Sequence, residues 1–62
     1  MNLIAKGREL RTTKVAYLWR TGNYKYEIER TAGGLTRSTY LDASYEDALK
    51  TFDLTVDGMV VY

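Results

Sequence analysis

The chain has 62 residues, with nine Lys or Arg against eight Asp or Glu and a formal net charge of +1. A chain this short is near the lower limit for burying enough apolar surface to offset its conformational entropy, so we expect one small domain over 1–62. The absence of Cys and His excludes a disulfide framework, the usual zinc sites and the commonest catalytic bases and nucleophiles. The near-neutral charge is neither the basic excess typical of DNA binding nor the large negative charge of a DNA mimic.

No segment of the sequence indicates a membrane or a catalytic centre. No apolar run is long enough for a secretory signal or for the roughly 20 residues of a membrane span, so we expect a cytoplasmic protein without membrane contact. Asp53 and Asp57 have the spacing of a metal pair on a helix, but acidic residues on an exposed helix face are usually solvated. Calcium-loop and phosphate-loop motifs are absent. We therefore expect no enzymatic activity, no metal and no cofactor.

The first eleven residues have no clear periodicity. A short edge strand over 3–5 is one interpretation, but several cations and a Gly follow it. We treat 1–11 as an arm of uncertain order. The cations of this arm and of the residues just after it are candidates for nucleic-acid contact: Lys6, Arg8, Arg11 and Lys14.

Strand-favouring residues run from 12 to 20 in the alternating pattern TTKVAYLWR. Gly22 and Asn23 then suit a two-residue hairpin turn, because both residue types tolerate a positive φ. A second strand is expected over 24–31.

A turn at Gly22 and Asn23 determines how these two strands pair. Residues paired across an antiparallel ladder share a face. With this pairing, the alternating apolar residues of the two strands lie on the same face. The predicted pairs are Arg20 with Lys25, Trp19 with Tyr26, Leu18 with Glu27, and Tyr17 with Ile28. The face predicted to be buried is formed by Val15, Tyr17, Trp19, Tyr24, Tyr26 and Ile28.

Gly33 and Gly34 predict a second hairpin of the same kind, leading to a third strand over 35–41. This turn pairs Glu27 with Tyr40 and Ile28 with Thr39.

The segment 42–53, DASYEDALKTFD, predicts an amphipathic helix. Ser44 is a suitable N-cap, and Asp47 completes a capping box. Apolar residues recur at helical spacing, and they must be buried against the sheet. They are Tyr45, Ala48, Leu49 and Phe52.

Two interpretations of the C-terminus are open. In the first, the helix continues to about Val56, Gly58 caps it, and 59–62 forms a short strand. In the second, the helix ends near Asp53 and 54–62 forms a hairpin around an Asp-Gly turn. We favour the first, because Val56 extends the apolar stripe.

The predicted fold class is α+β: a three-stranded antiparallel sheet with one amphipathic helix packed on one face and a short C-terminal strand, in the order βββαβ. One helix covers one face only, and the opposite face, called the outer face, is either solvated or binds a partner. In the predicted register Leu18, Glu27 and Tyr40 form a row across it. Leu18 and Tyr40 would be anchors, with Arg20, Lys25 and Glu27 as a polar rim. The alternative is an ordinary polar face with one Leu and one Tyr.

Three antiparallel strands followed by a covering helix resemble the DNA-binding module of plant ethylene-response transcription factors and of phage integrase arm-binding domains. The similarity covers about residues 14–58 and lies in GNYKYEIER, STYLDASYEDALKTFD and Gly58. It implies that the outer face reads duplex DNA, with Glu27 at the position of the family's glutamate. Glu29 departs from the family, which tends to have an arginine there, and this places a second carboxylate where phosphates and bases would lie.

The outline is also similar to small phage proteins that bind and disable host machinery, such as the inhibitor of bacterial RNA polymerase. A domain this small, with six Tyr and no His or Cys, is better suited to stoichiometric binding than to catalysis. We therefore expect a non-enzymatic protein, derived from a phage or a mobile element, that inhibits a host protein or nucleoprotein complex in an anti-CRISPR-like manner. A DNA-binding module and a structural or self-associating subunit, such as a homodimer, are the alternatives.

Overall fold

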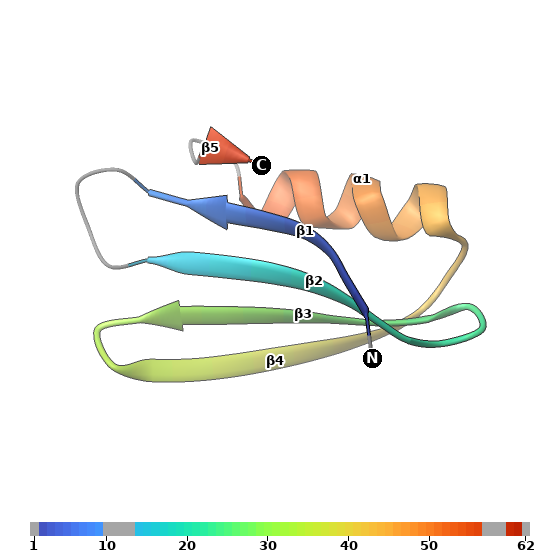
Figure 1. The fold of residues 1–62 in the computed structure, drawn as a ribbon, viewed down its shortest axis with the longest axis horizontal. Coiled ribbons are helices and arrows are strands. Elements are labelled where there is room, and N and C mark those ends of the chain that lie inside the picture. The colour runs from blue at the N-terminus through green and yellow to red at the C-terminus, as the bar shows by residue number, and fades with distance from the viewer. Residues whose placement is uncertain (1, 10–13, 57–59, 62) are drawn as a thin grey trace.

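The computed structural model describes residues 2–9, 14–56 and 60–61. One helix covers one face of an antiparallel sheet, which confirms the α+β class (Figure 1). The elements in chain order are β1 (Asn2–Arg8), β2 (Val15–Gly22), β3 (Lys25–Ala32), β4 (Leu35–Asp42), α1 (Tyr45–Thr55) and β5 (Val60–Val61). The strands are ordered β4-β3-β2-β1-β5 across the sheet, so a further long strand, β1, joins the three that the sequence predicts.

The N-terminal segment forms a strand, so its treatment as an arm is wrong for the described residues. β1 pairs antiparallel along β2, and Ile4 is the extra residue of a bulge between Leu3 and Ala5. Ile4 and Ala5 pack against the core, and Gly7 is buried. The bulge interrupts the alternation of β1, which is why no strand period is visible in its sequence.

The β2–β3 hairpin differs from the predicted one in its turn and in a bulge. The turn residues are Asn23 and Tyr24, one position later than predicted, and Tyr24 has a φ of 56°. A bulge between Arg20 and Gly22 leaves Thr21 as the extra residue of β2. The later turn alone would keep the predicted faces. The single bulged residue reverses them.

The predicted register is therefore wrong by one residue, which moves every β2 side chain to the opposite face. Leu18 pairs with Ile28 rather than Glu27, and Trp19 pairs with Glu27 rather than Tyr26. The β2 residues whose predicted place on the helix-covered face is wrong are Val15, Tyr17 and Trp19.

The β3–β4 hairpin matches the prediction. Gly33 and Gly34 have φ values of 58° and 81°, and a type I′ turn needs a positive φ at both positions. β3 and β4 pair without a bulge, and the predicted pair of Glu27 with Tyr40 is confirmed.

α1 begins at the predicted cap, where Asp47 N–H donates a 3.2 Å hydrogen bond to Ser44 Oγ. The helix ends at Thr55 with Val56 as C-cap, and β5 pairs with β1. This confirms the interpretation with a longer helix and a short final strand, and the alternative hairpin is wrong. The predicted cap at Gly58 lies outside the described residues.

The core lies between α1 and the central strands. Because Ala16 and Leu18 carry no polar side-chain atoms, they can be buried under the helix without needing hydrogen-bond partners, unlike Tyr or Trp. Within the described residues, every buried side-chain nitrogen or oxygen has a hydrogen-bond partner. The buried hydrophobic residues are Ala16, Leu18, Tyr26, Ile28, Ala48, Phe52 and Val56.

Replacing Leu18 with Ala should lower the free energy of unfolding by about 2–5 kcal/mol, because the side chain is 0% exposed and its removal leaves a cavity. Leu54→Ala is the matched control, since Leu54 is 81% exposed and should change stability by less than about 0.5 kcal/mol. Urea denaturation measures both. Equal effects would contradict the burial of Leu18.

Candidate functional site

The outer face of the sheet is the face turned away from α1. Strand register and the alternation of side chains determine which residues lie on it. They are Leu3, Lys6, Arg8, Val15, Tyr17, Trp19, Lys25, Glu27, Glu29, Thr31, Thr36, Ser38, Tyr40 and Asp42.

A row of four side chains crosses the middle of the outer face, one from each long strand. Leu3 pairs with Trp19, Trp19 with Glu27, and Glu27 with Tyr40. Leu3 is 49% exposed, Tyr40 is 73% exposed and Trp19 is partly exposed. This set, called the central row, replaces the predicted row of Leu18, Glu27 and Tyr40.

A second row borders the central row on the side of the β3–β4 turn. Lys6 pairs with Tyr17, and Tyr17 pairs with Glu29. The Lys6 Nζ atom lies 5.6 Å from the centroid of the Tyr17 ring, within the range of a cation–π contact. The Tyr17 and Trp19 rings lie 6.0 Å apart between centroids with an interplanar angle of 35°. The partly exposed aromatic side chains therefore form one connected group.

Glu27 places a carboxylate among these aromatic side chains. The residue is only 9% exposed, and its Oε2 accepts a 2.8 Å hydrogen bond from Ser38 Oγ. An ionised carboxylate has about four lone-pair sites, so this one bond leaves acceptor capacity. The outer face thus combines apolar area with a positioned hydrogen-bond acceptor.

Two of the five predicted partner-binding residues lie on the other side of the sheet, which corrects the prediction. Leu18 is in the core. Arg20 pairs with Tyr26 on the helix-facing side, and its Nη2 donates to Asn23 Oδ1 at 3.1 Å. Both errors follow from the bulge in β2. The predicted residues that do lie on the outer face are Lys25, Glu27 and Tyr40. Their binding role stays a prediction.

Sequence reasoning missed Leu3, Tyr17 and Trp19 as outer-face residues. Both alternating sets of β2 are apolar, so periodicity cannot choose between them. Ala16 and Leu18 carry no polar side-chain atom, which favours their burial, but Tyr26 in the core shows that this preference does not decide the face by itself.

The cations predicted to form a nucleic-acid arm do not gather on one surface. Lys6 and Arg8 lie on the outer face. Lys14 precedes Val15 and points to the helix-facing side, with its Nζ 4.0 Å from a Glu9 carboxylate oxygen. Arg11 lies outside the described residues.

Over 2–9, 14–56 and 60–61, no group of three or more His, Cys, Asp or Glu side chains is arranged to hold a metal ion. In the same part of the chain, no helix has the length and apolar character needed to cross a membrane.

Comparisons of the chain with protein-family models, with curated proteins and with solved structures found no match. The geometry and chemistry of the outer face therefore have to indicate what this chain binds.

Replacing Ser38 with Ala should lower the free energy of unfolding by about 1.5–3 kcal/mol, because it removes the donor to the poorly exposed Glu27 carboxylate. Ser38→Thr keeps the hydroxyl and should retain most of the stability. Urea denaturation followed by Trp19 fluorescence measures both variants. A Ser38→Ala protein as stable as the parent would contradict the role of this bond.

Proposed function

We propose that this chain is a small non-enzymatic binding protein of phage or mobile-element origin. It uses its outer face to bind and inhibit a host protein or nucleoprotein complex. The observation that carries the proposal is the central row, Leu3, Trp19, Glu27 and Tyr40, on the face that α1 leaves uncovered. Large aromatic side chains are enriched among the residues that dominate binding energy at protein interfaces.

The outer face is suited to binding because its aromatic side chains are held on a paired sheet. Trp19 and Tyr17 contact each other, and Lys6 lies over Tyr17. Side chains that are already positioned lose less conformational entropy when a partner binds.

The charges on the outer face favour a protein partner over duplex DNA. Glu27 and Glu29 lie in its interior on β3, where a DNA-reading sheet would meet phosphates and bases. Lys6 and Lys25 add positive charge beside them, so both signs are present. A partner surface with apolar area and both charges complements this arrangement, whereas a phosphate backbone does not.

Replacing Trp19 or Tyr40 with Ala should weaken partner binding by at least about tenfold, because each removes an aromatic group from the central row. Tagged variants and parent are compared by capture of a partner from host lysate, with circular dichroism confirming the fold. Leu54→Ala and Tyr24→Ala are the controls, since both side chains are exposed and neither is in the central row. Undiminished capture by both Trp19→Ala and Tyr40→Ala would refute the site.

DNA binding through the same face is distinguished by a gel shift against duplex DNA at two salt concentrations. Contacts to phosphates would make the affinity fall steeply with salt, and Lys6→Ala and Arg8→Ala would weaken it further.

Self-association is a second candidate function, and the exposed edge of the sheet favours it. β4 is an edge strand of eight residues that pairs with β3 without a bulge. It contains no Lys and no Pro, two of the features that commonly prevent edge strands from pairing, and its charged residues are Arg37 and Asp42. The type I′ turn directs the backbone N–H and C=O groups of Leu35 toward β3. Because these groups alternate in direction along a strand, those of Thr36, Ser38 and Tyr40 point away from β3, toward the open edge of the sheet.

A second copy of the chain can pair with β4 antiparallel about Ser38. This register places Leu35 opposite Leu41, Thr36 opposite Tyr40 and Arg37 opposite Thr39 of the second copy. Leu35, which is 70% exposed, would then face the apolar Leu41 of the second copy. Tyr40, which is 73% exposed, would face Thr36 of the second copy.

Thr39→Lys tests this candidate, because it places a Lys opposite Arg37 of the second copy at two symmetric positions. Like charges directly opposite each other destabilise a strand pair, so any dimer should dissociate. Thr51→Lys on the exposed side of α1 is the matched control. Sedimentation velocity at several concentrations measures the outcome. A parent protein that is monomeric throughout would exclude self-association through β4.

A further inference from the structure

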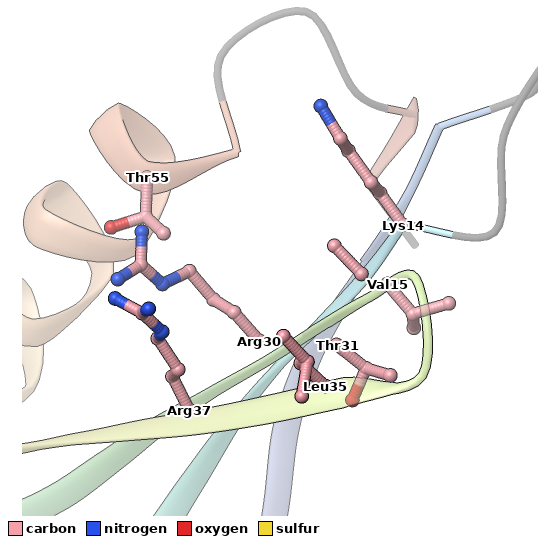
Figure 2. Close-up of a pocket in the computed structure, with 8 residues that line it drawn as sticks. Lys14, Val15, Arg30, Thr31, Leu35, Arg37 and Thr55 are labelled. Carbon is pink, nitrogen blue, oxygen red and sulfur yellow. The ribbon is translucent and has the colours of Figure 1, made fainter.

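A basic cavity of about 420 Å³ lies on the helix-facing side of the sheet, near the start of β2, the β3–β4 turn and the end of α1 (Figure 2). Its lining includes Val15 and Thr31, which lie on the outer face, but no residue of the central row, so the site is independent of the proposed function. The residues of its lining that matter for its chemistry are Lys14, Arg30, Arg37, Thr55, Ala32 and Leu35.

Two arginines dominate the cavity. Arg30 and Arg37 pair directly across β3 and β4, and Figure 2 shows their side chains lying side by side and reaching toward Thr55 of α1. Both are exposed. Among the residues that the structure describes, neither guanidinium has a hydrogen-bond or ion-pair partner. Because like charges opposed across a ladder repel, this pair is unfavourable unless negative charge is close by.

No described residue that lines the cavity supplies a carboxylate to offset the charges of Arg30 and Arg37. The C-terminal end of a helix carries about half a negative charge, and α1 has no basic residue in its last turn to neutralise it. That is much less than the charge of two guanidinium groups. Lys14 adds a further cation, which is paired with Glu9 at 4.0 Å, and none of the residues lining the cavity is acidic.

We infer that this cavity binds a phosphate group, held between Arg30 and Arg37. Guanidinium groups match the oxygens of phosphate with paired hydrogen bonds, and a doubly charged anion replaces the repulsion between them with attraction to both. A carboxylate has one charge and two oxygens, so it satisfies two guanidinium groups less well.

The size of the cavity indicates a phosphate carried by a small organic molecule. Its volume of about 420 Å³ falls within the range of small-molecule sites, about 300–1,000 Å³, and exceeds the needs of a phosphate ion alone. Leu35 and Ala32 supply apolar wall beside the arginines. The ligand class is therefore a phosphate monoester, with inorganic phosphate as the minimal ligand.

The test is a titration of the ¹⁵N-labelled protein with inorganic phosphate and, separately, with adenosine monophosphate, at an ionic strength held constant with sodium chloride. Saturable shifts of backbone amide signals at the β3–β4 hairpin are expected with both. Tighter binding of the nucleotide identifies a site for the ester, and equal binding identifies a site for the phosphate group alone. Either result supports the inference.

Arg30→Gln and Arg37→Gln should each weaken binding by at least about tenfold, the effect of losing charge-assisted hydrogen bonds. Arg20→Gln is the matched control, because Arg20 is an exposed arginine on the same side of the sheet near the other hairpin, and it should leave binding unchanged. The absence of saturable shifts with both ligands, or equal weakening by Arg20→Gln, would overturn the inference.

Discussion

The bulge at Thr21 determines which side chains of β2 are buried under α1, and most of the remaining structure depends on it. With this extra residue, Ala16 and Leu18 join Phe52 in the core. Without it, the helix would have to cover Tyr17 and Trp19, whose polar atoms would then need partners inside a very small core. Since β1 pairs with β2, the same choice determines which of its residues face inward.

The two sides of the sheet consequently have different chemistry. The outer face carries aromatic side chains around the Glu27 carboxylate, which is held by Ser38. The helix-facing side is apolar under α1 and basic beyond the end of the helix, where Arg30 and Arg37 lie. Because α1 is short relative to the sheet and covers the central strands, β4 is left exposed along most of its length. Because the one helix is small, the outer face, the basic cavity and the β4 edge all remain uncovered.

Much of the candidate site could be predicted where it depends on local signals. Gly33 and Gly34 predict the β3–β4 turn because both positions need a positive φ, and this hairpin places Glu27 and Tyr40 on the outer face. Leu18 was wrongly placed there because its face depends on the β2 bulge, which no residue type marks. β1 was missed because its own bulge interrupts the alternation of its side chains.

The sequence by itself determined the helix, its cap and the two-glycine hairpin, because each depends on residues close together in the chain, and these elements indicated the α+β class. The short final strand pairs with β1 at the other end of the chain, and the sequence left it as one of two interpretations. Only the tertiary structure decided which face of β2 is buried. Over residues 15–19 both alternating sets of that strand are largely apolar, and one helix can cover only one of them. Packing buried Ala16 and Leu18, while Arg20 on the same side is exposed, and that choice placed Trp19 rather than Leu18 in the central row.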